Sequence, residues 1–202
     1  MKNTHGRAPA RLSPASKSAR NRVRIIGGHW RSRQIEFPDA PDLRPTADRV
    51  RETLFNWLGQ SLHGKRCLDL FAGSGALGFE ALSRGADRVV MVENRRTVYA
   101  ALELNAKQLY AHNLTLVYAD ARQFVRNCKE IFDVVFLDPP FHTDFLEAIL
   151  DSLPDILADD AVVYVESGRD LADVARNWTI LKSNRAGIVK FGLIVAPESG
   201  ES

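Results

Sequence analysis

The stretch Asp69-Leu70-Phe71-Ala72-Gly73-Ser74-Gly75-Ala76-Leu77-Gly78 decides the fold of this chain of 202 residues. It overlaps an apolar run, residues 67–71, that is typical of a buried strand, and it leads into helical sequence over residues 76–84. Its glycines form a G-x-G-x-x-G pattern at a strand-to-helix turn, where glycine lets the backbone approach a ligand and the helix N-terminus adds a positive dipole. The pattern predicts a ligand site if partner residues follow, and a plain tight turn if they do not.

The rest of the chain alternates strands and helices. Apolar, β-branched runs indicate further strands at residues 89–92, 114–118, 132–137 and 161–165, and helical sequence follows each of them. This alternation is typical of a parallel sheet covered on both faces. The last two runs, 178–182 and 188–195, are separated by only five residues, too few for a crossover helix. We therefore expect an α/β fold, a Rossmann-like sheet of seven mostly parallel strands that closes with a C-terminal antiparallel hairpin.

Acidic residues at strand ends bear on the kind of ligand. Glu93 lies 20 residues after Gly73, where a carboxylate can accept both hydroxyls of a ribose. Nicotinamide dinucleotides and S-adenosylmethionine share this geometry. Asp69 can meet a methionine ammonium, Asp120 can accept from an adenine amino group, and the closing hairpin is typical of methyltransferases, so we expect S-adenosylmethionine, with S-adenosylhomocysteine as product. Asp120 is alternatively the N-cap of a helix that begins at Ala121, and both roles can coexist.

The fold class is then that of a class I S-adenosylmethionine-dependent methyltransferase. The predicted cofactor-binding residues are Asp69, Phe71, Ala72, Gly73, Ser74, Gly75, Gly78, Glu93, Asp120 and Ala121. We expect no metal, because Cys67 and Cys128 are isolated and lack the spacing of a zinc site or a disulfide framework.

The tetrad Asp138-Pro139-Pro140-Phe141 directly follows the strand predicted at residues 132–137. Two adjacent prolines make a stiff extended loop whose carbonyls stay free as acceptors. Asp138 and the Pro139 carbonyl can each accept an N–H from a flat base that carries an exocyclic NH₂, which turns the nitrogen lone pair toward the sulfonium methyl, and Phe141 can stack on the base. We predict these four residues to be catalytic, through positioning and electrostatics and without a histidine base. A simple strand-ending turn is the alternative.

The charge of the chain is unevenly distributed. The formal net charge is +2, yet residues 1–35 hold nine basic side chains and no acidic one, while the remaining residues carry 18 basic and 25 acidic side chains, a formal −7. Nine positive charges without a negative one indicate contact with a polyanion. No apolar run is long enough for a membrane span or a secretory signal peptide, and the isolated cysteines suit a reducing cytosol, so we expect a cytoplasmic protein.

Composition also suggests boundaries along the chain. The expected segments are a disordered basic arm at 1–21, an RNA-contacting extension with a helix at 22–62, the methyltransferase domain at 63–197 and a tail at 198–202. Thr46 is a candidate cap for a helix whose apolar residues recur from Val50 to Leu58.

Several motifs resemble those of the RsmD-type 16S rRNA guanine-N2 methyltransferases. They are 24–31 (RIIGGHWR), 43–58 (LRPTADRVRETLFNWL), 69–78 (DLFAGSGALG), 138–141 (DPPF) and 163–166 (VYVE), and the resemblance extends over roughly residues 22–195. It implies S-adenosylmethionine as methyl donor, one guanine N2 of 16S rRNA as target and an assembled 30S particle as substrate. One departure is Arg31-Ser32-Arg33 where the family usually has Arg-Gly-Arg, which loses the conformational freedom of glycine.

Basic residues near the N-terminus are the candidates for RNA contact in a monomeric enzyme. The predicted RNA-binding residues are Arg22, Arg24, Arg31, Arg33, Arg44, Arg49 and Arg51. Arg49 is placed near the active-site mouth by the resemblance alone. Arg49 and Arg51 cannot share one helix face, because residues two apart point in nearly opposite directions.

Two other functions remain open. The tetrad also occurs in DNA adenine-N6 and protein-glutamine amide methyltransferases, although Asp rather than Asn at 138 and the lack of a separate recognition domain argue against both. A non-catalytic RNA-binding protein on the same fold would have no affinity for S-adenosylmethionine, whereas the predicted cofactor residues are intact.

Overall fold

The computed structural model describes residues 20–41, 43, 45–140 and 146–197. Its main sheet has seven strands in the order β5-β4-β3-β6-β7-β9-β8. Neighbours from β5 to β7 are parallel, and β9 is antiparallel to both β7 and β8. The predicted mostly parallel sheet with a closing hairpin is therefore confirmed. The strands are β3 (Arg66–Asp69), β4 (Arg88–Glu93), β5 (Leu114–Tyr118), β6 (Phe132–Leu137), β7 (Leu157–Ser167), β8 (Thr179–Ala186) and β9 (Val189–Val195).

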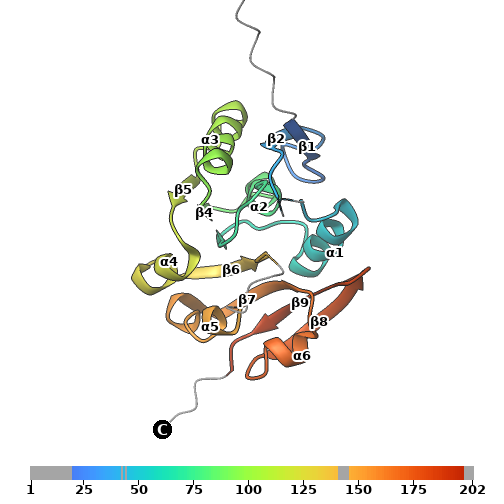
Figure 1. The fold of residues 1–202 in the computed structure, drawn as a ribbon, viewed down its shortest axis with the longest axis vertical. Coiled ribbons are helices and arrows are strands. Elements are labelled where there is room, and N and C mark those ends of the chain that lie inside the picture. Colours follow the sequence, from blue (N-terminus) through green and yellow to red (C-terminus); the bar gives the residue numbers. More distant parts are fainter. Residues whose placement is uncertain (1–19, 42, 44, 141–145, 198–202) are drawn as a thin grey trace, which may run out of the picture.

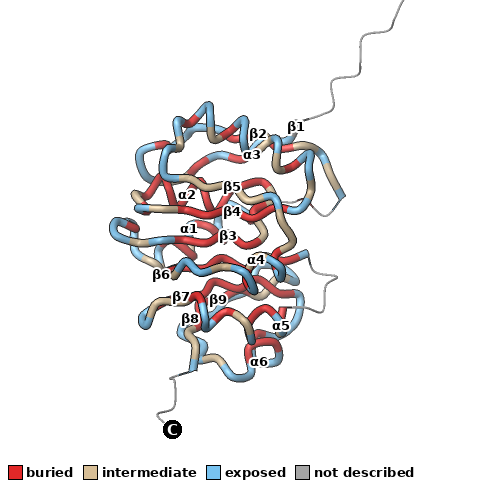
Figure 2. Tube along the Cα trace, turned by 90° about the vertical axis from the view of Figure 1, so that its left-hand side faces the viewer, coloured by how far each residue is buried: buried red, intermediate tan, exposed pale blue. Residues whose placement is uncertain are grey.

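Helices cover both faces of this sheet, with α1 on one side and α4 and α5 on the other (Figure 1). The helices are α1 (Asp48–Leu58), α2 (Ala76–Ser83), α3 (Arg96–Leu109), α4 (Ala121–Asn127), α5 (Leu146–Leu150) and α6 (Leu171–Val174), with a 3₁₀ turn, η1 (Pro154–Ile156). Successive strand side chains enter opposite cores: Val89 packs with α1 to α3, and Val90 packs with α4 to α6. The central strands are buried along most of their length, which explains their continuous apolar sequence (Figure 2).

A separate antiparallel hairpin, β1 (Arg20–Arg24) and β2 (Gln34–Pro38), packs on α3. The buried side-chain amide of Asn105 on α3 hydrogen-bonds both backbone polar groups of Glu36, as a neighbouring strand would. It donates to the Glu36 carbonyl at 2.7 Å and accepts from the Glu36 N–H at 3.0 Å. Val23 and Ile35 join the core of the first sheet face. The extension is thus continuous with the main domain, and its first strand begins at Arg20, inside the segment 1–21 that the sequence predicts to be disordered. Most of that segment, and the predicted tail, lie outside the described residues.

The loop between β1 and β2 contains the departure from the family pattern. Ser32 has φ of +70°, a left-handed conformation that glycine adopts more easily than serine. Its N–H donates to the Ile25 carbonyl at 2.8 Å, which holds the loop in this shape. The structure therefore explains why glycine is favoured here, and Ser32 adopts the same turn at some conformational cost.

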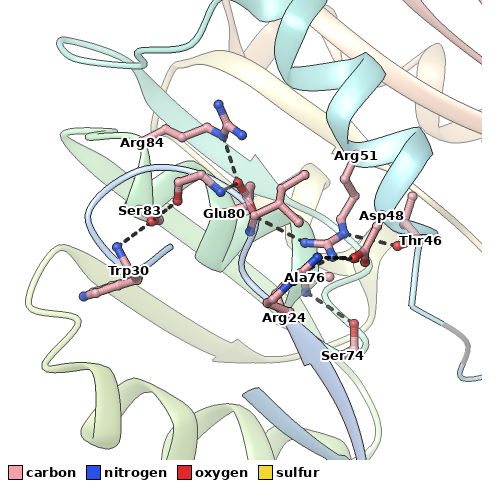
Figure 3. Close-up of polar contacts among 12 residues, drawn as sticks. Arg24, Trp30, Thr46, Asp48, Arg51, Ser74, Ala76, Glu80, Ser83 and Arg84 are labelled. Atoms are coloured by element: carbon pink, nitrogen blue, oxygen red, sulfur yellow. Dashed lines mark hydrogen bonds and ion pairs between the residues drawn. The ribbon is translucent and has the colours of Figure 1, made fainter. Parts of the chain in front are cut away.

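A buried ion pair between Arg51 on α1 and Glu80 on α2 joins this extension to the sheet domain (Figure 3). Glu80 accepts from the backbone N–H groups of Ile26 and Gly27 at 2.8 and 2.7 Å, from Arg84 Nε at 2.9 Å and from Arg51 Nη1 at 3.2 Å. Both Arg51 and Glu80 are fully buried. Burial of such charges is tolerated only when they are paired and hydrogen-bonded throughout, as they are here.

The other donors of Arg51 hold the segment before α1. Its Nε donates to the Thr46 carbonyl at 3.2 Å, and its Nη2 donates to the Arg24 carbonyl at 2.8 Å and to Asp48 Oδ1 at 2.6 Å. Arg51 is therefore a structural residue, and its prediction as an RNA contact is wrong because no part of its side chain is exposed. The prediction that Thr46 caps α1 is also wrong. The N-cap is Ala47, without a side-chain cap.

Within the described residues, no helix has the length and apolar character required to cross a membrane.

Glu80→Gln is expected to lower the free energy of unfolding by about 3–5 kcal/mol, because it removes the buried charge that pairs with both Arg51 and Arg84 and leaves Arg51 only the partly exposed Asp48. Denaturant unfolding measures the effect. Glu52→Gln, an exposed substitution on the same helix as Arg51, is the matched control and should change stability by less than about 0.5 kcal/mol. A Glu80→Gln protein as stable as this control would contradict the structural role of the pair.

Candidate active site

The candidate site lies where the order of the strands reverses. From β3 the chain passes through α2 to β4 on one side, and β6 later adds to the other side of β3. Ligands of open α/β sheets bind at such a switch point, outside the carboxyl ends of the strands. Asp69 ends β3, and Asp138 directly follows β6, so the two carboxylates stand at the ends of neighbouring strands.

The glycine turn brings α2 close to the sheet. Gly75 is the N-cap of α2 with φ of +80°, and a Cβ there would lie 2.7 Å from Leu102 Cδ2. A Cβ on Gly78 would lie 2.3 Å from Met91 Cε on β4, so a side chain at 78 would require the buried Met91 side chain to move. Among the other predicted cofactor residues of the turn, Ala72 and Ser74 are buried and Phe71 is half-buried. The sequence pattern thus reflects both a turn conformation and tight helix–strand packing.

Asp69 lies beneath this turn and is almost completely buried. Its Oδ2 accepts from the Gly78 N–H at 3.1 Å. Burial raises the pKa of Asp69 to about 7, against hydrogen bonds from the Gly78 and Phe71 backbone that lower it. A cation bound beside Asp69 would replace the lost hydration of the carboxylate, so this position suits a positively charged ligand group.

Glu93, at the end of β4, holds the opposite end of the turn. Its Oε2 accepts from the Gly73 N–H at 3.1 Å, and its Oε1 accepts from Arg95 Nε at 3.1 Å. The buried carboxylate is therefore aimed at the glycine turn, as a ribose-binding acid must be. Arg95 was not predicted from the sequence. It shares the acceptor that ribose hydroxyls would use.

Asp120 caps the next helix. Its Oδ1 accepts from the Gln123 N–H at 3.1 Å, and the alternative role predicted for it, the N-cap of the helix that begins at Ala121, is confirmed. The side chain is still 43% exposed, which leaves acceptor capacity for a ligand. Contact between Asp120 and an adenine amino group remains a prediction.

On the other side of β3, the Asp138 carboxylate is held by the segment before α1. Thr46 Oγ1 donates to Asp138 Oδ2 at 3.2 Å. Burial raises the pKa of Asp138 well above the usual carboxyl range, and the neighbouring Glu166 carboxylate raises it further. Pro139 is buried and Pro140 is exposed, while Phe141 and His142 lie outside the described residues.

The predicted RNA-binding arginines divide into three groups. Arg22, Arg24, Arg31, Arg33 and Arg49 are exposed, Arg51 is buried, and Arg44 lies outside the described residues. Arg22 pairs with Glu36 at 2.8 Å, and Arg24 pairs with Asp48 at 3.5 Å.

Two clefts run along this basic side of the molecule. One, of about 310 Å³, is lined by Arg22, Arg24, Gln34, Thr46 and Asp48, and so reaches the residue that holds Asp138. The other, of about 500 Å³, has Arg31 and Arg84 in its wall. Two of the exposed arginines, Arg22 and Arg24, thus line the cleft that reaches Thr46.

The sequence did not predict a place in the site for three residues: Thr46, Arg95 and Glu166. Thr46 was predicted only as a helix cap, and its contact with Asp138 could not be foreseen because it spans 92 residues. Glu166 belongs to a quoted motif, and the parallel register of β6 and β7 would have placed it beside Asp138 once the strand order was known. In the described part of the chain, no group of three or more metal-ligating side chains is present.

Asp69→Asn is expected to change how stability depends on pH. The raised pKa means that native Asp69 holds its proton up to about pH 7, whereas the unfolded carboxyl loses it near pH 4, so this group destabilises the wild type as pH rises through that window. The stability of the variant relative to the wild type should therefore rise between pH 5 and pH 8, by roughly 1–4 kcal/mol. Thermal unfolding across this range tests it, with the exposed Asp155→Asn as control. A pH-independent difference would contradict it.

The sequence is similar to a known family and to named proteins. A family model described as conserved hypothetical protein 95 matches residues 23–195. Ribosomal RNA small subunit methyltransferase D of Escherichia coli (strain K12) is 44% identical over 195 residues, 95% of this chain and 98% of that protein. The protein of the same name in Haemophilus influenzae is 42% identical over 183 residues, 87% of this chain and 95% of that protein.

Solved structures agree in fold. The yhhF structure from Escherichia coli is 44% identical, with a TM-score of 0.80 over 88% of this chain and 99% of that chain. The structure of SMU.776 complexed with SAH is 15% identical, with a TM-score of 0.69 over 93% of this chain and 57% of that chain, and shows the methyltransferase fold alone. Because the family model covers most of the chain and both relatives exceed 40% identity along nearly their whole length, the chain belongs to the ribosomal RNA small subunit methyltransferase D family.

Proposed function

We propose that this protein transfers a methyl group from S-adenosylmethionine to the exocyclic N2 amine of one guanine in 16S rRNA. The observation that carries the proposal is the pair of carboxyls at the ends of neighbouring strands β3 and β6, the buried Asp69 and the half-buried Asp138. One suits the cationic donor and the other suits an amine acceptor. The rRNA substrate is suggested by the names of the relatives.

The cofactor side of the site fits S-adenosylmethionine in three respects. Asp69 offers a carboxylate to the methionine ammonium, Glu93 offers acceptors to the ribose, and Asp120 offers one to the adenine amine. When bound, the cofactor supplies an electrophilic methyl on a sulfonium and becomes neutral S-adenosylhomocysteine as the methyl leaves. Release of Glu93 from Arg95 Nε would free the acceptor that a ribose hydroxyl needs.

The acceptor side acts by orienting a weak nucleophile. An exocyclic amine of a base has its lone pair delocalised into the ring, and Asp138 and the Pro139 carbonyl can hold its two N–H bonds so that the lone pair points at the methyl. A methyl group in line with this lone pair would pass to the amine nitrogen with release of the neutral thioether, and the amine proton would then pass to water, because alkylation makes it more acidic. Asp138, Pro139, Pro140 and Phe141 contribute by position and electrostatics. The target base must leave its stack to reach them.

RNA attraction would come from the basic side of the molecule. Arg22 and Arg24 of the β1–β2 hairpin line the cleft that reaches Thr46, and Arg31 lines the second cleft. Residues 1–35 carry nine positive charges, which offset the formal −7 of the rest of the chain. We propose that the substrate is an assembled 30S particle. We propose further that the enzyme is monomeric and cytoplasmic. Methyl transfer to adenine N6 or to a glutamine amide is the second candidate. Both reactions need only one carboxylate or amide of the protein to accept a hydrogen bond from the target amino group.

Asp138→Ala is expected to lower methyl transfer by at least about 10³-fold while S-adenosylhomocysteine binding changes only a few-fold. The assay offers labelled S-adenosylmethionine with undermethylated 30S subunits, naked 16S rRNA, DNA and protein, and then identifies the methylated nucleoside or amino acid. Asp155→Ala, an exposed substitution in η1, is the control. Near-normal turnover of Asp138→Ala would refute the proposed acceptor site, and label in DNA or protein alone would refute the proposed substrate.

Arg31→Ala combined with Arg49→Ala is expected to weaken RNA association and to flatten its salt dependence. Each lost phosphate contact lowers the slope of log K against log salt by about 0.7–0.9, so the pair should lower it by about 1.4–1.8. Binding of 16S rRNA over a salt titration measures the slope. Lys129→Ala with Arg176→Ala, two other exposed cations, is the charge-matched control. Equal slopes for both double variants would remove Arg31 and Arg49 from the interface.

A further inference from the structure

Glu166 stands directly beside Asp138. Strands β6 and β7 are parallel, with Leu137 opposite Val165, so the next residues of the two strands, Asp138 and Glu166, lie side by side where the carboxyl ends open into the site. Glu166 is 5% exposed, and its Oε1 accepts from Tyr164 Oη at 2.7 Å. Neither Asp69 nor the glycine turn needs this carboxylate, and the mechanism described above leaves it without a role.

Two described side chains donate to the neighbouring carboxyls, Thr46 to Asp138 and Tyr164 to Glu166. The Thr46 hydroxyl acts on both Asp138 and Glu166, but it has only one proton to donate, and that proton is directed to Asp138 Oδ2. Burial raises the pKa of both carboxyls, and Glu166 raises that of Asp138 further. A ligand that brings adjacent N–H donors would satisfy both carboxylates at once.

We propose that Glu166 is a specificity-determining residue that accepts the N1–H of the target guanine while Asp138 accepts one N2–H. The inference rests on the proposed function and adds to it the way in which guanine is chosen. The Watson–Crick edge of guanine presents N1–H next to the N2 amine, three N–H donors in a row. Glu166, Asp138 and the Pro139 carbonyl supply three acceptors in matching order along the strand ends.

The same arrangement rejects other amino-bearing groups. Adenine presents its N6 amine next to N1, whose lone pair would face the Glu166 carboxylate. A glutamine amide has a carbonyl oxygen next to its NH₂ and would meet the same repulsion. A site built to hydrogen-bond a donor rejects an analogue that lacks it far more strongly than an apolar site does, because its own buried polar group is left unpaired.

The base analogue 2-aminopurine isolates this contact. It keeps the exocyclic amine at position 2 but has no hydrogen on N1, so it offers the reacting nitrogen of guanine without the proposed donor. The substrates are small-subunit rRNAs assembled by ligation and packed into 30S particles, with guanosine or 2-aminopurine at the nucleotide that the wild type methylates. The measured quantity is the ratio of kcat/KM for the two substrates, because a loss of active protein cancels in it.

The wild type is expected to prefer guanosine by at least about 100-fold. In Glu166→Gln the amide N–H can donate to N1 of 2-aminopurine, so the ratio should fall by at least about tenfold. Glu103→Gln, an exposed substitution on α3, should leave the ratio unchanged. A ratio in Glu166→Gln within about twofold of the wild type would overturn the role of Glu166 alone. If the wild type methylates no guanine of small-subunit rRNA, the proposed function is overturned instead, and this inference with it.

Discussion

The buried ion pair of Arg51 and Glu80 is the interaction on which the arrangement of the site depends. Burying two charges is favourable only if nearly all their hydrogen-bonding capacity is used, and here it is used to join the hairpin loop, α1 and α2. The same guanidinium holds the Thr46 carbonyl, and the Thr46 hydroxyl holds Asp138. A continuous set of polar contacts therefore runs from the N-terminal extension to the proposed acceptor carboxylate.

The motif at residues 43–58 contains both residues of this polar network and an exposed basic residue. Thr46, Asp48 and Arg51 belong to this one stretch, and all three take part in the polar network around Glu80. Arg49 in the same stretch and Arg31 in the hairpin loop are exposed. The polar network and the exposed charges thus involve different residues of neighbouring segments.

The two carboxyls at the strand ends, Asp69 and Asp138, suit ligand groups of different chemistry. Asp69 and Asp138 lie at the ends of the neighbouring strands β3 and β6, and burial raises the pKa of each. Such groups gain most from a partner that restores what water no longer supplies, a positive charge beside the first and N–H donors beside the second.

Much of the fold and half of the site follow from the amino-acid sequence. The alternation of apolar strands with helices predicted the mostly parallel sheet. The five-residue spacing before the last apolar run predicted the closing hairpin. The glycine turn, Glu93 and the tetrad at Asp138 were found because local motifs carry them.

Long-range contacts were decided only by the tertiary structure. Arg51 is indistinguishable in sequence from the exposed Arg49, yet one is buried and the other is not, because burial depends on Glu80, 29 residues away. Glu166 became a neighbour of Asp138 only through the register of two parallel strands. Local sequence determines backbone conformation and periodicity, whereas the partner of a charged side chain depends on which distant segments the packed core brings together.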